Sequence, residues 1–260
     1  TINKVKSTVR TRIHSKIHHG IIFALTGLVL CCYACHFSGS KTIVSIQGDQ
    51  WQINGDPVLA GSLAEGHLVN VRMVNAVFED SGPAAAEHLT GDFDPDKNTA
   101  QFISRIPDYY NHGVRAFTIS LQGGMPGYEG AVNSAFNADG SLKQKYLQRV
   151  AKVIEAADQQ GAVVILSCFY QRQHSNESAL DGKQAIFKAV SNVVHWIQQE
   201  RFSNVILEVS NEFSHGGFNK WKDGEWLRSV EGQVELITHA KRIAPDLLVS
   251  TSGMGSGLAL

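Results

Sequence analysis

Asn211 and Glu212 stand one residue beyond the run Val205–Val209, after Ser210, and this pair is the feature of the sequence best suited to chemistry. A carboxyl group that is partly buried at a strand end favours its protonated form and can act as a general acid. The neighbouring amide can hold a substrate hydroxyl beside the bond that breaks. The structural alternatives are a first-turn acid for Glu212 and a cap or turn residue for Asn211.

Polar or aromatic side chains stand within or after the other apolar runs as well. In a parallel α/β fold the chemistry gathers at the carboxyl ends of the strands, so we expect these side chains to meet. The residues expected to line one pocket are Asn75, Arg115, Gln122 and Tyr170. Trp221, in the loop after Glu212, offers a flat ring on which a sugar can stack, with core packing as the alternative.

Alternating apolar and amphipathic runs define the elements that must position these residues. The expected strands are 68–77, 114–121, 162–169, 204–209 and 247–250, and the expected helices are 99–110, 142–157, 186–197 and 230–240. A hairpin with an Asn54-Gly55 turn precedes them. Apolar strands joined by helices predict a parallel sheet, either an open doubly wound sheet or a (β/α)8 TIM barrel. The first strand lacks the glycine fingerprint of dinucleotide binding.

Residues 1–40 carry five basic residues and no acid, and they contain the apolar run Ile21–Phe37. This layout is typical of a secretory leader, and we expect an exported protein. An uncleaved membrane anchor and a lipid-attachment cysteine are the alternatives. Only Cys168 lies beyond this segment, so an internal disulfide is not expected there. The sequence thus divides into 1–40, the leader or anchor, and 41–260, the folded part.

The composition limits the class of protein. The 260 residues are 43% hydrophobic and 18% charged, which favours a well-packed core. With 23 basic and 24 acidic residues the net charge is -1, and a nucleic-acid binder is not expected. The part after residue 40 holds no histidine or cysteine pattern of a tight metal site, so we expect neither a metal nor a cofactor.

The segment Val205–Glu212 resembles the fourth strand of clan A glycoside hydrolases, the family 5 cellulase-like (β/α)8 barrels. The resemblance covers about residues 50–255 and implies that Glu212 is the acid/base and that Asn211 contacts a sugar 2-hydroxyl. Gly113-Val114-Arg115 resembles the second-strand segment, whose arginine lies beneath the nucleophile. The implied activity is hydrolysis of β-linked oligo- or polysaccharides by a retaining double displacement.

Two departures from the family pattern qualify this expectation. The third strand ends in Phe169-Tyr170-Gln171, where family members usually have a histidine. The family nucleophile is a glutamate at the end of strand seven, whereas about five βα units are visible here. Glu208 lies inside a strand, where we expect it to contact the barrel interior. We therefore expect an incomplete barrel that is inactive as a fragment.

Two other classes of protein remain open at this stage. A non-catalytic, surface-attached carbohydrate-binding barrel would explain the missing histidine and the single visible carboxylate. The other is an α/β hydrolase or isomerase with an open sheet, which a continuation of the chain with only one further strand would support. A glutamate at the end of a seventh strand would favour the glycoside hydrolase over both.

Overall fold

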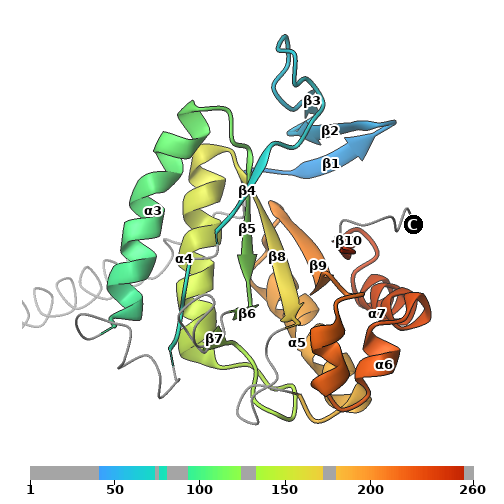
Figure 1. Ribbon diagram of the computed structural model, residues 1–260. Coiled ribbons are helices and arrows are strands. Elements are labelled where there is room, and N and C mark those ends of the chain that lie inside the picture. Colours follow the sequence, from blue (N-terminus) through green and yellow to red (C-terminus); the bar gives the residue numbers. More distant parts are fainter. Residues whose placement is uncertain (1–40, 74–75, 81–92, 124–132, 172–179, 255–260) are drawn as a thin grey trace, which may run out of the picture. The chain divides into compact units, whose positions relative to one another are not determined.

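The computed structural model describes residues 41–73, 76–80, 93–123, 133–171 and 180–254. The predicted leader, residues 1–40, lies outside these ranges. Five parallel strands form the main sheet in the order β10-β9-β8-β5-β4 (Figure 1). Their bounds are Asn70–Arg72 for β4, Ala116–Ser120 for β5, Val163–Tyr170 for β8, Val205–Asn211 for β9 and Leu248–Ser250 for β10. All five strands were predicted, although β4 is much shorter than the apolar run that indicated it.

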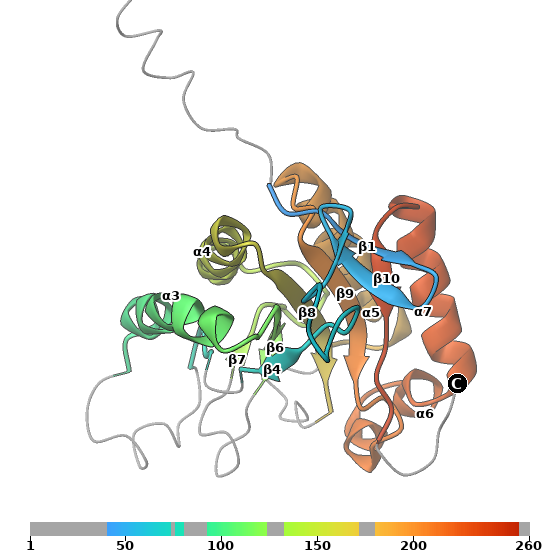
Figure 2. The ribbon, with the colours of Figure 1, turned by 90° about the horizontal axis from the view of Figure 1, so that it is seen from above.

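The strand order distinguishes the two predicted architectures. Strands that follow one another in the chain are neighbours across the whole sheet. A doubly wound sheet reverses its order at a switch point, whereas a barrel does not. Figure 2 shows the helices on the outer side of the curved sheet. The described residues therefore form five strands of a TIM-barrel-type α/β fold, as predicted.

Four long helices cover the sheet, and each begins or ends close to its predicted position. They are α3 (Pro95–Asn111), α4 (Gln144–Gln160), α5 (Lys183–Gln199) and α7 (Val230–Ile243). Asp94 caps α3 by accepting hydrogen bonds from the amides of Asp96 and Lys97. Gly161 ends α4 in the left-handed conformation, with φ at 79°, which glycine adopts without steric cost. No helix of the described residues is both long and apolar enough to cross a membrane.

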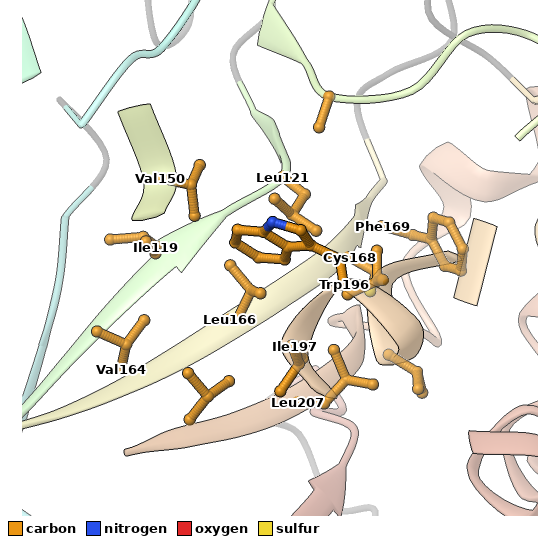
Figure 3. Close-up of a cluster of buried hydrophobic side chains, with 14 of the residues drawn as sticks. Ile119, Leu121, Val150, Val164, Leu166, Cys168, Phe169, Trp196, Ile197 and Leu207 are labelled. Carbon is orange, nitrogen blue, oxygen red and sulfur yellow. The ribbon is translucent and has the colours of Figure 1, made fainter. Parts of the chain in front are cut away.

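The main core lies between the sheet and these helices. Val164, Leu166 and Cys168 alternate along β8 and are fully buried (Figure 3). Trp196 and Ile197 of α5 belong to the same cluster and are also buried. Cys168 is a core cysteine, as expected, and its burial raises the pKa of the thiol.

An antiparallel hairpin lies at the amino ends of the barrel strands. Its strands are β1 (Val44–Gln47), β2 (Gln50–Ile53) and β3 (Asp56–Pro57). Asn54 and Gly55 both have positive φ, 55° and 88°, as a two-residue hairpin turn requires. Val44 packs with residues at the amino ends of β5, β8 and β9, so the hairpin covers this end of the sheet. The opposite end is left for chemistry.

Short elements surround the carboxyl ends. Strands β6 (Gln122–Gly123) and β7 (Asn133–Ser134) pair with each other after β5. The 3-10 helix η1 (Gly216–Lys220) and helix α6 (Gly224–Leu227) follow β9 before α7 begins. These elements are visible at the lower edge of the sheet in Figure 1, where the arrowheads of the strands point.

Candidate active site

The carboxyl ends of β8 and β9 lie side by side, because the two strands pair in parallel with Tyr170 opposite Asn211. The next residue of each strand, Gln171 and Glu212, therefore leaves the sheet at the same edge. Ser252, shortly after β10, joins them, and its Oγ accepts a hydrogen bond from the Glu212 backbone N–H at 3.0 Å. Three consecutive strands thus place polar groups around one carboxyl group.

A row of hydrogen bonds connects four side chains at this edge. Arg72 Nη1 donates to Asn211 Oδ1 at 2.5 Å, and Asn211 Nδ2 donates to Gln171 Oε1 at 2.8 Å. Gln171 Nε2 then donates to Glu212 Oε2 at 2.6 Å. Asn211 and Gln171 are 5% and 3% exposed, whereas Arg72 and Glu212 are half-buried. The two middle members of the row are therefore buried, and solvent can reach the residues at both of its ends.

The backbone of Glu212 is unusual for a residue with a side chain. Its φ is 46°, in the left-handed region, where non-glycine residues are uncommon. The hydroxyl of Ser252 satisfies its N–H, and the Phe213 N–H donates to the Ser252 carbonyl at 2.8 Å. Residues held in this way often belong to functional sites, because the surrounding contacts must overcome the strain. The bend ends β9 and turns the Glu212 side chain away from the regular strand direction.

The two oxygens of the Glu212 carboxyl group differ in their surroundings. Oε2 is bound by Gln171, whereas Oε1 has no hydrogen-bond partner among the residues that the structure describes. A half-buried carboxyl group with one fixed and one free oxygen can give and take a proton at the free oxygen. Within the described ranges, no three or more histidine, cysteine or acidic residues gather as a metal site would require.

Comparison with protein families shows to which family this chain belongs. The model of the cellulase family, glycosyl hydrolase family 5, matches residues 82–246. The chain belongs to family 5. The match includes β5, β8 and β9 and therefore the residue pair Asn211 and Glu212. No curated protein matches the chain.

Solved structures of similar fold support the barrel architecture. The β-1,4-D-mannanase from Cryptopygus antarcticus is 13% identical, with a TM-score of 0.51, over 82% of this chain and 61% of the mannanase. The endo-1,4-β-mannanase from Rhizomucor miehei is 12% identical, with a TM-score of 0.50 and the same two coverages. At these identities the likeness shows the fold alone. The chain spans about 61% of the length of either mannanase.

Arg115 does not lie in the family 5 site, and the prediction that it lines the pocket is wrong. It precedes β5 at the amino end of the sheet, where its Nη1 donates to the carbonyls of Tyr110 and Val114. Its guanidinium lies 3.8 Å from the centroid of the Tyr110 ring. The carbonyls at the end of α3 attract a cation, which explains this placement. Arg72 is the arginine that reaches Asn211.

Gln122 and Tyr170 are both buried next to the site residues. Gln122 is fully buried, its Oε1 accepts from the Tyr170 N–H at 3.4 Å, and its Nε2 donates to Ser134 Oγ at 3.3 Å. It therefore joins β8 to β7, and the prediction that it contacts substrate is wrong. Tyr170 is 4% exposed, and the Arg72 guanidinium lies 5.6 Å from its ring centroid. Tyr170 thus lies beside Arg72 and opposite Asn211, and its contact with substrate stays a prediction.

Trp221 is a core residue, so the prediction of a sugar-stacking platform is wrong. It is 4% exposed and packs edge-on against Phe169 and Phe218, with ring centroids 6.0 and 5.4 Å apart. An aromatic ring in a loop after a strand can pack against buried side chains or face solvent, and the sequence does not distinguish the two. Asn75, the remaining predicted pocket residue, lies outside the described ranges.

Sequence reasoning missed Arg72, Gln171 and Ser252 as site residues. The rule that chemistry gathers at the carboxyl ends of strands pointed to Gln171 and Ser252, since both follow a strand. Their pairing with Glu212 depends on the register between strands, which no local pattern displays. Arg72 is the last residue of β4, and its contact with Asn211 on β9 links two strands that are far apart in the sequence.

Two hollows of the described surface lie away from Glu212. A hollow of about 380 Å³ at the amino end of the sheet is lined mainly by apolar residues of the hairpin, α5 and the β10 region. Another, of about 440 Å³, lies between α4 and α5. Neither contains Glu212, so the candidate site is identified by the convergence of strand ends and by the carboxyl group at their rim.

Proposed function

We propose that the chain supplies the acid/base part of a glycoside hydrolase site that cleaves β-linked oligo- or polysaccharides with retention of configuration. The observation that carries the proposal is the Glu212 carboxyl group, whose Oε2 is bound by Gln171 and whose Oε1 has no hydrogen-bond partner among the described residues. Glu212 gives its proton to the glycosidic oxygen as the bond from that oxygen to the sugar breaks. It then takes a proton from the water that attacks the glycosyl–enzyme intermediate. Membership of family 5 supports this assignment.

Asn211 is proposed to hold the sugar beside that carboxyl group. Its carbonyl oxygen accepts a hydrogen bond from Arg72, so we propose that its NH₂ group acts toward the sugar, as a donor. One N–H bond of Nδ2 points to Gln171, and the second remains for a sugar hydroxyl oxygen. Asn211 thereby places the reacting sugar at a defined distance from Glu212.

The nucleophile must be a second carboxyl group about 5–5.5 Å from the first. Glu208 does not qualify, because it lies inside β9, in register with Ser167 and Ser250, and is 7% exposed. Its Oε2 is buried and has no hydrogen-bond partner within the part of the chain that the structure describes. We propose that the nucleophile comes from outside the described ranges, and the experiments below use the full-length gene product that contains this chain.

The decisive experiment is the Glu212→Gln substitution. We expect turnover of β-1,4-linked manno- or cello-oligosaccharides to fall by about 10²- to 10⁴-fold, the usual contribution of a general acid. Glu225→Gln is the matched control, because Glu225 is an exposed glutamate on the nearby helix α6. Unchanged hydrolysis by the Glu212 variant, with wild-type activity confirmed, would remove Glu212 from the mechanism.

The retaining step has its own test. In a Glu212→Ala variant of a retaining enzyme, azide can enter the space of the carboxyl group and attack the glycosyl–enzyme intermediate. The bond from the sugar to the nucleophile breaks, a bond to azide forms, and the product is a glycosyl azide with the configuration of the substrate. A product of inverted configuration in proton NMR of the wild-type reaction would contradict the retaining mechanism.

A non-catalytic carbohydrate-binding barrel is the second candidate. This candidate is favoured because, among the described residues, the carboxyl ends of β8, β9 and β10 carry a single carboxylate, that of Glu212. Such a protein would bind β-linked glycans equally well as the wild type and as the Glu212→Gln variant, and it would release no product. Binding on a glycan array together with reducing-sugar release separates this candidate from the hydrolase.

We further propose that the protein is exported, with residues 1–40 as leader or membrane anchor. The support is the run of basic and then apolar residues without acids. Amino-terminal sequencing of the protein recovered outside the cytoplasm gives the cleavage point. Recovery of the uncleaved chain in the cytoplasm would contradict export.

A further inference from the structure

The hydrogen-bond row at the candidate site has a donor-only group at one end. Arg72 carries a guanidinium, which has no acceptor, so the atom of Asn211 that faces it must be the amide oxygen. The Asn211 NH₂ group then faces Gln171, whose side-chain oxygen must accept from it. The Gln171 NH₂ group is consequently turned toward the Glu212 carboxyl group.

This sequence of contacts fixes both amides without reference to the carboxyl group. If the Asn211 amide were turned over, its NH₂ group would face the guanidinium. If the Gln171 amide were turned over, its NH₂ group would face that of Asn211. Both amides are at least nine-tenths buried, so water cannot readily replace the lost bonds. The orientation of Gln171 is therefore imposed from Arg72, three contacts away from the free oxygen of Glu212.

The backbone of Gln171 is held as firmly as its side chain. Gly217 of η1 packs so closely on it that a Cβ atom at Gly217 would lie 2.3 Å from the Gln171 carbonyl oxygen. The Gly217 N–H is occupied by His215 Nδ1, at 2.8 Å, which fixes the start of η1 over this peptide group. Gln171 thus has a fixed peptide, a fixed amide and one N–H directed at Glu212.

We propose that Gln171 is a positioning residue for the acid/base Glu212: it holds Oε2, so that Oε1 is the oxygen that carries the transferred proton. This inference rests on the proposed function. In the first step the Oε1–H bond breaks as the glycosidic oxygen gains the proton and its bond to the sugar breaks. In the second step Oε1 takes a proton from the attacking water. Gln171 itself neither gains nor loses a proton.

The activity test compares substrates that need the proton with substrates that do not. Gln171→Met keeps the length of the side chain and removes the donor. We expect kcat/KM of the full-length protein to fall by about 10- to 100-fold on a β-linked oligosaccharide and by less than about threefold on a dinitrophenyl glycoside, whose leaving group needs no acid. A merely structural residue would lower both substrates equally. Gln148→Met, at an exposed position of α4, is the control.

A pH profile adds a second readout. In Gln171→Glu, a carboxylate replaces the donor beside Glu212, and like charges favour the protonated form of the pair. The alkaline limb of the pH profile for oligosaccharide hydrolysis should then move to higher pH. An unmoved limb, or equal losses on both substrates with Gln171→Met, would overturn the role of Gln171 while leaving that of Glu212 intact.

A spectroscopic test is independent of activity. The side-chain NH₂ protons of Gln171 should shift with pH in the wild-type chain, because one of them bonds to the carboxyl group that is proposed to give and take the proton. They should not shift in this way in Glu212→Gln. If the wild-type protein hydrolyses no glycan but this coupling is present, the proposed function fails while the geometric basis for Gln171 stands. If the NH₂ protons ignore pH in an active wild-type protein, the positioning role is refuted.

Discussion

Gly217→Ala is expected to damage both the stability of the fold and the candidate site. The added Cβ would lie 2.3 Å from the Gln171 carbonyl oxygen and 3.0 Å from His215 Nδ1. The first of these contacts is with the backbone of Gln171, the residue that follows β8, and cannot be relieved by a side-chain rotation. The peptide group of Gln171 must move by about 0.7 Å for the contact to reach even 3.0 Å. Glu212 would lose the alignment of its hydrogen-bond donor as a consequence.

The neighbouring glycine provides a matched control. A Cβ atom at Gly216 has no other atom within 4 Å, and Gly216 and Gly217 both lie in η1. Overpacking of this kind costs about 1–3 kcal/mol, so the free energy of unfolding of the Gly217→Ala variant should be lower than that of the wild type by that amount. Gly216→Ala should be neutral or stabilised by up to about 1 kcal/mol, because alanine loses less conformational entropy on folding than glycine. The two variants differ by one position and by nothing else.

Two assays measure the consequences. Urea unfolding should place the midpoint of Gly217→Ala below that of Gly216→Ala, and thermal unfolding should separate them by roughly 2–4 °C per kcal/mol. The full-length Gly217→Ala protein should also lose oligosaccharide hydrolysis more than dinitrophenyl glycoside hydrolysis. Equal midpoints for the two variants would refute the close packing of η1 on β8 and, with it, the fixed position of Gln171.

Two further predictions concern titratable groups outside the site. Burial, and secondarily the charge of Glu208, raise the pKa of the Cys168 thiol. Iodoacetamide should therefore modify this thiol at least about a hundredfold more slowly in the folded protein than in urea, as followed by mass spectrometry of its tryptic peptide. Fast labelling of the folded protein would contradict the burial of Cys168. Burial lowers the pKa of His239, with smaller contributions from the positive charges of Arg242 and His195. The unfolded chain therefore binds a proton first as pH falls below about 6.5, and the free energy of unfolding should decrease there. His239→Gln should flatten this dependence in urea unfolding between pH 7 and 5, and an unchanged slope would exclude His239 as its source.

The positions of strands, helices and turns could largely be predicted from local patterns. Asn54-Gly55 forms the predicted hairpin turn because few other residues adopt positive φ at both positions. Gly161 ends α4 for the same reason. The strand β1 was not predicted, because its pairing partner β2, rather than its own pattern, makes it a strand. The choice between barrel and open sheet needed the observed strand order.

The candidate site was predictable only in part. Glu212 and Asn211 were found because they follow the clearest apolar strand of the sequence. Arg115 was misassigned because a strand-borne charge can turn toward either end of the sheet, and the end of α3 attracted it. Trp221 was misassigned because a loop aromatic can pack inward as well as outward.

The sequence by itself determined which segments are apolar, how they alternate and which carboxyl group follows the fourth barrel strand, because these properties depend on neighbouring residues alone. Tertiary structure decided which side chains meet that carboxyl group. The register of β8 against β9 brings Gln171 to Glu212, and the short strand β4 brings Arg72 to Asn211. Contacts between residues as far apart in sequence as 72 and 211 arise only when strands pair, and no local pattern encodes that pairing.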